Sequence, residues 1–425
     1  MQRNANCAFY YEVIEKGEKT IMKKRPAVLL IATMDTKADE ALYIEKCLQK
    51  EGVSVVIMDP GIRGNPRYKI DFSRGRVARA SGRTLKEVRA AGNEAKALNM
   101  MIPGAIKCAH DLYEGGKIDG IISLGGTMGT SIGTAIMRSF PFGIPKVMIS
   151  TMASSNTRNF VGTKDIVMLH SVSDIAGLNR VTRSVLHNGA LAVAGMVKGR
   201  EMPRVKERPA VALSSLGTTD GCASEVRKAL EKDGYEVITF HTNGTGGRAM
   251  EEMISQMDIR GLVDLSLNEI ATHHFGGDFD AGPERGTAAL KKGIPTVMVP
   301  GNIDFLVTGP MEEAKKRFPG KELHSHNEAI SAACVERKEQ EILARTLAET
   351  WNRHTGPLAV FVPLKGFSSY NSKTGPFYHP ETPRYFAASL REALKEEIPL
   401  NILPFHINDI EFARAIVEGF NDMEA

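Results

Sequence analysis

In the second half of the chain, a series of acidic, histidine and arginine residues follows one apolar run. The run 265–269 predicts a strand that ends in a carboxylate, and two histidines, two aspartates and an arginine follow it. Imidazole and carboxylate groups bind several divalent metals, and a histidine can also act as a general base beside an arginine that binds an oxyanion. The pattern predicts Glu269, His273, His274 and Arg285 as catalytic residues and Asp278 and Asp280 as metal ligands.

The spacing of these residues matches no zinc signature such as H-E-x-x-H. Scattered surface and core histidines are therefore the competing interpretation for each imidazole. Arg285 is expected to pair with a carboxylate or phosphate of the substrate through its fork of donors.

A glycine-rich turn in the first half of the chain suggests an anion site. The apolar run 121–124 is followed by Gly125, Gly126 and Gly129, and the segment 130–138 reads as a helix. Such a strand-turn-helix unit presents unpaired backbone N–H groups and the positive end of a helix dipole, and glycines let a phosphate approach closely. The motif is not a P-loop, because no Gly-Lys-Ser/Thr follows the glycines. A tight turn without a ligand is the alternative.

The elements around these sites alternate between strand and helix. A strand over 27–33, a helix over 36–51 and a strand over 53–58 predict βαβ units and a mostly parallel sheet buried on both faces. The arginine-rich stretch 67–97, with a capping box at Thr84 and Glu87, reads as a solvated helical insertion, with a basic rim as the alternative. A second capping box, at Ser325 and Glu328, predicts a helix that runs to about Arg353.

The chain repeats itself after a charged, proline-containing linker at 198–208. Segments at 25–30, 50–56 and 143–150 correspond in order to segments at 208–213, 232–238 and 293–300. We therefore expect two tandem Rossmann-like α/β domains, each an open, mostly parallel sheet with helices on both faces. The expected boundaries are an N-terminal appendage at 1–23, a first domain at 24–200 and a second at 209–425.

The composition argues against nucleic-acid-binding, membrane-spanning and disulfide-rich proteins. The net charge of +4 is diffuse and does not suggest nucleic acid, and no apolar stretch reaches the roughly 20 residues that span a bilayer. The five cysteines are scattered and odd in number, so neither a disulfide framework nor a zinc ribbon is expected. A cytoplasmic protein with no membrane partner fits best.

Several of these segments carry a family resemblance over nearly the whole chain. They are Ile31-Ala-Thr-Met-Asp-Thr-Lys37, 59–61, Leu124-Gly-Gly-Thr-Met-Gly-Thr130 and 150–155 in the first half, and 214–219, 241–246 and 299–302 in the second. The sequence resembles the family that includes the ATP-binding, N-terminal inhibitory region of the tomato mosaic virus resistance protein. The resemblance implies two Rossmann-like subdomains, ATP binding and a homodimer or higher homo-oligomer.

With ATP as the implied ligand, the first-domain loops form a phosphate site. Asp35 is expected to bind Mg²⁺, Thr36 to cap the following helix and Lys37 to reach a phosphate, with ordinary N-capping as the competing interpretation. The whole predicted cofactor set is Asp35, Thr36, Lys37, Gly125, Gly126, Thr127, Gly129, Thr130, Ser154, Ser155 and Asn156.

Three functions follow from these residues. The first is a cytosolic ATP-binding enzyme that hydrolyses ATP, or uses it on a small anionic metabolite, in the cleft between the domains. The second is a nucleotide-regulated protein-interaction module without chemistry. The third is a metal-dependent hydrolase or lyase without a nucleotide.

Overall fold

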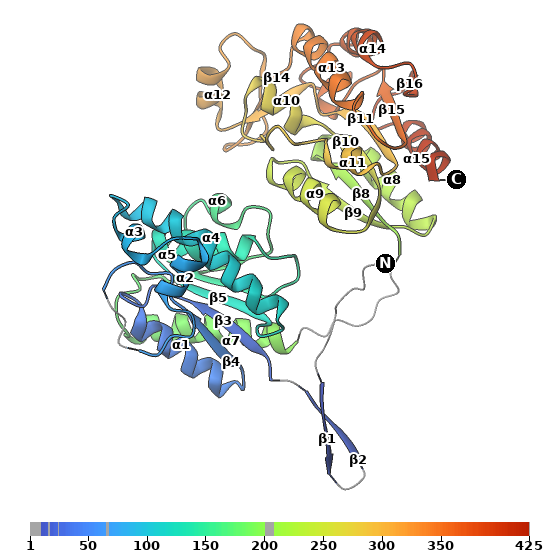
Figure 1. Cartoon of the computed structure of the whole chain (residues 1–425). Helices are drawn as coiled ribbons and strands as arrows, with labels where there is room; N and C mark the ends of the chain where they lie inside the picture. The colour runs from blue at the N-terminus through green and yellow to red at the C-terminus, as the bar shows by residue number, and fades with distance from the viewer. Residues whose placement is uncertain (1–9, 16–17, 24, 65–67, 200–207, 425) are drawn as a thin grey trace. The chain divides into compact units, whose positions relative to one another are not determined.

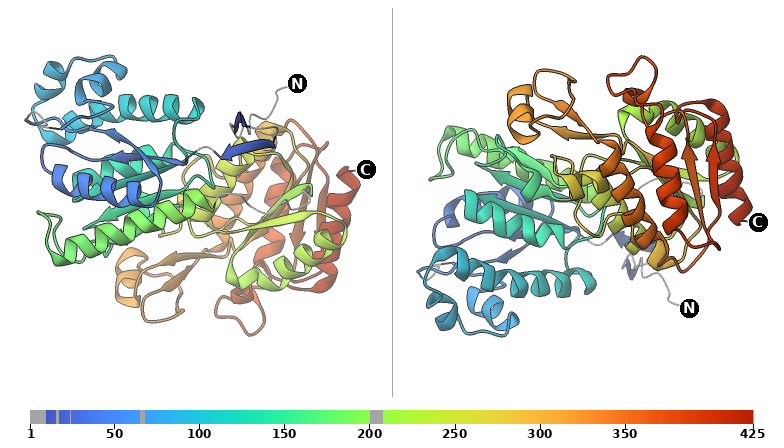
Figure 2. Two further views of the ribbon diagram at one scale, coloured as in Figure 1. Left: turned by 90° about the horizontal axis from the view of Figure 1, so that it is seen from below. Right: turned by 90° about the horizontal axis from the view of Figure 1, so that it is seen from above.

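The computed structural model describes residues 10–15, 18–23, 25–64, 68–199 and 208–424, within two compact units, Met1–Arg204 and Val205–Ala425. Each unit is an open parallel sheet with helices on both faces (Figures 1 and 2), so the predicted tandem α/β architecture is confirmed. Most of the expected linker lies outside the described residues. In the N-terminal appendage, β1 (Tyr10–Glu15) and β2 (Glu18–Lys23) pair as an antiparallel hairpin.

The sheet of unit 1 has five parallel strands in the order β4-β3-β5-β6-β7. Its first strand lies inside the sheet, so the winding reverses between the first and third strands. In open α/β sheets, ligands bind beyond the carboxyl ends of the strands at such a switch point. The strands are β3 (Ala27–Ile31), β4 (Ser54–Met58), β5 (Gly120–Gly125), β6 (Lys146–Ser150) and β7 (Val167–His170).

Helices cover both faces of this sheet. Alternate residues of β3 and β5 point to opposite faces, where Leu30 and Ile122 belong to one core cluster and Leu29 and Ile121 to another. α1 (Ala38–Lys50) and α7 (Arg180–Lys198) pack on the first cluster, and α4 (Glu94–Glu114) and α5 (Thr127–Arg138) pack on the second.

The arginine-rich insertion is only partly solvated. α2 (Arg74–Ala80) and α3 (Leu85–Arg89) bury Val77, Ala78 and Val88 in the core, and the capping box of Thr84 and Glu87 opens α3 as predicted. Most of its arginines are exposed, whereas Arg74 is 4% exposed. The interpretation as a solvated insertion therefore fails for Arg74.

Unit 2 repeats the strand order of unit 1 and adds one strand. Its six parallel strands follow the order β16-β15-β11-β10-β8-β9, with the switch point between β8 and β10. The strands are β8 (Ala210–Ser215), β9 (Glu236–His241), β10 (Ile259–Ser266), β11 (Thr296–Gly301), β15 (Leu358–Pro363) and β16 (Leu400–Leu403).

The helices of unit 2 also lie on both faces of the sheet. α8 (Asp220–Lys232) and α15 (Ile410–Glu424) share one core cluster. The other face carries α9 (Thr245–Gln256), α10 (Asn268–Phe275), α11 (Ala288–Lys292), α13 (Arg337–Trp351) and α14 (Thr382–Ala393).

A small antiparallel sheet is inserted after β11. It has the order β12-β14-β13, formed by β12 (Phe305–Thr308), β13 (Leu323–Ser325) and β14 (Ser331–Cys334), and α12 (Met311–Arg317) follows its first strand. This insertion corrects the helix predicted from Ser325 to Arg353. Ser325 Oγ donates to the carbonyl of Asn327 in a turn between β13 and β14, and α13 begins only at Arg337.

Two further predicted boundaries are wrong. α1 begins at Ala38, and Thr36 Oγ1 lies 3.1 Å from Thr33 Oγ1 instead of capping the helix. β10 ends at Ser266, so Glu269 lies in the first turn of α10 and not at a strand end. Among the described residues, no helix is both long and apolar enough to cross a membrane.

Candidate phosphate turn and buried arginine network

The turn between β5 and α5 offers backbone donors at the switch point of unit 1. Thr130 N–H donates to the carbonyl of Gly126, which closes the first turn of the helix. The N–H groups of Thr127, Met128 and Gly129 have no acceptor among the described residues, and Gly126 provides no side-chain cap. These N–H groups and the helix dipole can bind an anion.

The glycines of this turn differ in what they do. A Cβ on Gly125 would lie 2.8 Å from Cα of Gly129, so these two glycines let the helix pack closely on the strand. A Cβ on Gly126 would meet only Thr151 Oγ1, at 3.8 Å. Gly126 is therefore not required by packing, and the space beside it is open to a ligand.

Hydroxyl groups line the neighbouring strand end. Thr130 Oγ1 lies 2.6 Å from Ser150 Oγ, and both side chains are buried. Ser154, Ser155 and Asn156 follow β6 in an exposed turn. Because Gly125 and Ser150 are paired across β5 and β6, the predicted glycine and serine groups do share one sheet edge.

The end of β3 contributes Asp35, Thr36 and Lys37 to the same edge. Ile31 pairs with Ser123, so the residues that follow β3 are neighbours of the glycine turn. Asp35 Oδ2 accepts a hydrogen bond from the N–H of Arg63 at 2.9 Å, whereas its Oδ1 has no partner in the described chain. Lys37 Nζ donates to the carbonyl of Ile175, so its charge is held at the sheet edge by the backbone.

A buried ion pair that the sequence did not reveal supports this edge. Arg74 donates from Nε and Nη2 to Asp59 Oδ2 at 2.8 and 2.6 Å, and neither side chain is more than 4% exposed. Asp59 Oδ1 accepts from the N–H groups of Met34 and Gly61. The pair therefore fixes the loops after β3 and β4 to each other.

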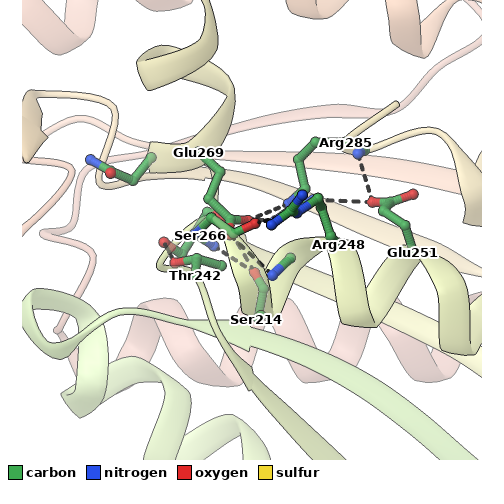
Figure 3. Close-up of polar contacts among 12 residues, drawn as sticks. Ser214, Thr242, Arg248, Glu251, Ser266, Glu269 and Arg285 are labelled. Carbon is green, nitrogen blue, oxygen red and sulfur yellow. Dashed lines mark hydrogen bonds and ion pairs between the residues drawn. The ribbon is translucent and has the colours of Figure 1, made fainter. Parts of the chain in front are cut away.

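The corresponding edge of unit 2 holds a buried network around Arg285 (Figure 3). Arg285 Nη1 and Nη2 donate to the two carboxylate oxygens of Asp264 at 2.6 and 2.7 Å. Its Nε donates to Glu269 Oε2 at 2.7 Å, and Nη1 also lies 3.4 Å from Glu251 Oε1. Nη2 donates further to the carbonyl of Ser266. All five donors of the guanidinium are therefore engaged inside the protein.

Glu269 is equally enclosed. Its Oε1 accepts from the N–H groups of Gly244 and Gly247 at 2.6 and 3.0 Å, and its side chain is fully buried. The structure thus brings the predicted pair Glu269 and Arg285 together inside unit 2. Their contacts join α10, α9 and the loop before α11.

Hydroxyl groups complete the network below the arginine (Figure 3). Ser214 Oγ donates to Asp264 Oδ1 at 2.7 Å and accepts from the N–H of Ser266 at 2.8 Å. Thr242 Oγ1 lies 2.7 Å from Ser266 Oγ, and Arg248 Nε donates to the carbonyl of Gly244. The ends of β8, β9 and β10 are therefore bound to one another by side chains.

The charges of this network shift two pKa values. Burial alone would lower the pKa of Arg285, but the charges of Asp264, Glu269 and Glu251 outweigh it and hold that pKa well above its usual value. Burial raises the pKa of Glu251, against the opposing effect of Arg285. Arg285 is therefore a permanent cation that balances carboxylates in the core.

The two predicted histidines lie on the outer part of α10 and make no hydrogen bond to this network that the structure shows. Their ring centroids are 5.6 Å apart, and His273 Nδ1 lies 3.0 Å from Asp280 Oδ1. His273 and His274 line a cavity of about 50 Å³ beside α13, and Arg285 lines the same cavity. Burial lowers the pKa of His274, and the neighbouring His273 adds to the effect.

The two predicted metal ligands of unit 2 pair with different side chains. Asp278 Oδ1 pairs with Arg317 Nη1 at 2.6 Å, whereas Asp280 pairs with His273. Among the described residues, no grouping of His, Cys, Asp and Glu with metal-site spacing includes Asp35, Asp278 or Asp280.

Asp304 is a further buried acid that the sequence did not reveal. It lies between β11 and β12, is 1% exposed, and accepts from Ser368 Oγ at 2.5 Å through Oδ2. Its Oδ1 is buried without a hydrogen-bond partner among the described residues. Burial raises the pKa of Asp304 to about 6, although the hydrogen bond from Ser368 opposes the shift. The sequence does contain a signal for this buried acid, because its carboxylate is flanked by apolar residues in the segment 303–307.

Comparison with protein-family models follows the division into two units. Residues 26–202 match the N-terminal domain of an uncharacterised protein family, UPF0261, and residues 208–424 match the C-terminal domain. The chain belongs to this uncharacterised family. The family expected from the sequence is thereby confirmed, and the two UPF0261 domains correspond to the two α/β units.

Relatives match over most of the chain. A UPF0261 protein of Clostridium tetani is 34% identical over 397 residues, which are 93% of this chain and 98% of that protein. A UPF0261 protein of Brucella suis is 32% identical over 400 residues, 93% of this chain and 95% of that protein. The ToMV resistance protein Tm-1(GCR237) of Solanum lycopersicum is 33% identical over 428 residues, which are 94% of this chain but 56% of the tomato protein.

One solved structure aligns with most of the chain at low similarity. The glycosyltransferase SsfS6 of Streptomyces sp. SF2575, complexed with thymidine diphosphate, aligns with 94% of this chain at 13% identity and a TM-score of 0.19. That likeness is too low to support a statement about fold or function.

Proposed function

We propose that this UPF0261 protein binds ATP in unit 1, with the phosphate chain on the N–H groups of Thr127, Met128 and Gly129. The observation that carries the proposal is that these three donors have no acceptor in the described chain and lie next to the open space beside Gly126. Unpaired donors at a helix N-terminus bind phosphate readily, and a glycine without a packing role leaves room for it. The choice of ATP among phosphate ligands rests on the family resemblance of the sequence.

Mg²⁺ fits the same edge through Asp35. Mg²⁺ is held by one or two carboxylates together with phosphate oxygens and water. Asp35 Oδ1 has no partner in the described chain, while Oδ2 is oriented by the N–H of Arg63 and lies 3.7 Å from Arg74 Nη1. Asp35 would therefore hold the ion directly or through water, and the ion would neutralise charge on the phosphates.

The proposal has two versions, which differ in whether the nucleotide is consumed. In the enzyme version, ATP is hydrolysed or used on a small anionic substrate, and His273 and His274 are the remaining candidates for proton transfer. Burial keeps His274 toward its neutral form, as a general base requires. In the module version, ATP stabilises a partner-competent or homo-oligomeric state, and no ADP forms.

Calorimetric titration of the full chain with ATP, ADP, AMP and adenosine tests nucleotide binding. If the turn holds the phosphate chain, affinity falls in that order and adenosine does not bind. Equal affinity for ATP and adenosine would contradict the phosphate turn. Asp35→Asn should weaken binding of ATP with Mg²⁺ and leave binding in EDTA unchanged.

An assay for ADP release then separates the two versions. In the enzyme version, His274→Ala lowers ADP release and leaves ATP affinity intact, whereas His187→Ala, an exposed histidine of unit 1, changes neither. In the module version no ADP is released, and light scattering shows a change of mass when ATP is added. Glu269 is unsuitable for this test because it is buried in the arginine network.

A further inference from the structure

Three side chains of different chemistry converge at the edge of the small antiparallel sheet in unit 2. Glu322 immediately precedes β13, and Cys334 ends β14. Leu323 pairs with Ala333, and the N–H of Cys334 donates to the carbonyl of Glu322 at 2.9 Å. Glu322 and Cys334 are therefore direct neighbours across the two strands, and such neighbours point to the same face.

The third group, His379, comes from the loop before α14. Its Nε2 lies 3.2 Å from Glu322 Oε2. The loop is fixed by Phe377, which is 1% exposed, and by the N–H of Thr382, which donates to the carbonyl of His379. The backbone of the loop is thus held in place on both sides of His379.

The spacing of the three groups is that of a metal site. One nitrogen, sulfur or oxygen atom of each residue lies within 4.8 Å of those of the other two. An ion bound to nitrogen, sulfur and oxygen at about 2.0–2.3 Å holds its ligands roughly 3–4 Å apart. Small side-chain rotations therefore bring all three groups to one ion.

The surrounding charge favours a cation. Asp304, Glu322 and Glu336 are the carboxylates that act on the Cys334 thiol, and Lys321 is the cation nearby. Lys321 is itself paired with Glu339, and its Nζ also donates to the carbonyl of Cys334. Among these described residues, three carboxylates therefore face one lysine, which is already paired with Glu339.

We propose that Glu322, Cys334 and His379 bind one Zn²⁺ ion, which ties the loop before α14 to the β13–β14 hairpin. Zn²⁺ accepts this mixture of oxygen, sulfur and nitrogen ligands, whereas Mg²⁺ and Ca²⁺ prefer oxygen alone. On binding, Cys334 loses its thiol proton to solvent. The Glu322 and His379 side chains are 59% and 40% exposed, so a water completes the coordination. This site is independent of the proposed nucleotide site in unit 1.

Cobalt provides a direct probe of the site. The full chain is stripped with a chelator and titrated with Co²⁺, which takes the place of Zn²⁺ and absorbs in the near ultraviolet when bound to a thiolate. We expect a thiolate-to-cobalt band that saturates at one equivalent and disappears when Zn²⁺ is added. Absence of the band would overturn the proposal.

Matched variants assign the band to these residues. Cys334→Ser should abolish it, whereas Cys222→Ser, at a buried cysteine outside any described metal grouping, should leave it intact. His379→Ala, on an exposed loop, should weaken Co²⁺ affinity at least tenfold, and His187→Ala should not. A band that survives in Cys334→Ser, or an unchanged Co²⁺ affinity in His379→Ala, would contradict the site. If Cys334→Ser does not fold, the His379→Ala and Glu322→Gln results decide.

Discussion

Arg285 pairs with three carboxylates in the interior of unit 2, and its positive charge compensates their negative charges. Asp264 and Glu269 are fully buried and receive two and one of its short hydrogen bonds. Removing one partner of a buried ion pair leaves an uncompensated charge and costs about 3–5 kcal/mol. The same reasoning applies to Arg74 and Asp59 in unit 1.

Arg285→Met should lower the free energy of unfolding by about 3–5 kcal/mol, because Asp264 and Glu269 would stay buried without a cation. Arg317→Met is the matched control, since Arg317 pairs with Asp278 at the surface, where such pairs contribute less than about 1 kcal/mol. Urea unfolding followed by circular dichroism measures both. Equal losses in the two variants would show that the buried network does not support unit 2.

Asp304 gives the stability of unit 2 a defined pH dependence. Its folded pKa of about 6 lies above the value of roughly 4 expected in the unfolded chain. Asp304 therefore contributes stability below about pH 4, and this contribution is lost as the pH rises through about 6. A shift of about 2 pKa units corresponds to roughly 3 kcal/mol.

The free energy of unfolding of Asp304→Asn, relative to that of the wild type, should therefore rise by about 3 kcal/mol as the pH rises from about 4 to about 7. The comparison uses urea unfolding of both proteins in a chelator, because other groups titrate equally in the two and cancel. A difference between the proteins that is independent of pH, or that grows toward low pH, would contradict a raised pKa.

The sequence predicted Glu269 and Arg285 as site residues but did not reveal the side chains that surround them. Their spacing suggested a substrate site, whereas the partners that enclose them, Asp264 and Glu251, come from β10 and α9 and were not recognised. Asp264 could have been suspected, because a carboxylate inside an otherwise apolar strand requires a partner. That partner is Arg285, which follows α10 in the chain. Local sequence does not encode this contact, because it depends on how the chain folds back after α10.

At the scale of elements, the packing of α5 against the sheet of unit 1 determines where the free N–H groups of this helix lie. Gly133 faces β5 directly, and a Cβ there would lie 2.4 Å from Ser123 Oγ and 2.8 Å from its Cβ. The helix can thus lie close to the strand only without a side chain at this position.

Gly133→Ala should destabilise the protein by about 1–3 kcal/mol through overpacking. Gly195→Ala in α7 is the matched control, since nothing lies within 4 Å of its Cβ position and alanine favours a helix by about 0.5–1 kcal/mol. Thermal unfolding should therefore move in opposite directions for the two variants. A stabilising Gly133→Ala would show that α5 does not depend on this close approach.

Local signals succeeded where they agreed with the surrounding fold. Apolar runs at strand length predicted the parallel strands, and the capping box at Thr84 predicted the start of α3. The similar signal at Ser325 failed, because Ser331–Cys334 pairs with β12 and β13 and is a strand. Its small apolar residues fit a helix or a strand, so only the long-range pairing could decide between them.

At the scale of the whole molecule, two units with one strand order have different carboxyl edges. In unit 2 that edge is closed by side chains, among them Asn268, whose Nδ2 donates to the carbonyls of Asn302 and Phe305. In unit 1 the donors of α5 are left without acceptors in the described chain. The repeat in the sequence predicted two similar sheets, and the side chains at the carboxyl edge of each sheet distinguish the units.

The most direct test of ATP binding in unit 1 is a thermal-shift titration with Mg-ATP of the wild type, Gly126→Asp and Gly217→Asp. An aspartate at position 126 occupies the N-cap of α5, where its carboxylate accepts from the free N–H groups and takes the place of a phosphate. Gly217, in the turn after β8, has similar open space, with Asp220 Oδ2 nearest at 4.0 Å. Both variants should therefore fold.

A ligand at about 100 times its dissociation constant adds roughly 2.7 kcal/mol of stability. We predict that Mg-ATP raises the melting temperature of the wild type and of Gly217→Asp, and leaves that of Gly126→Asp unchanged. An undiminished shift in Gly126→Asp, or no shift in the wild type, would contradict a nucleotide site at the turn between β5 and α5.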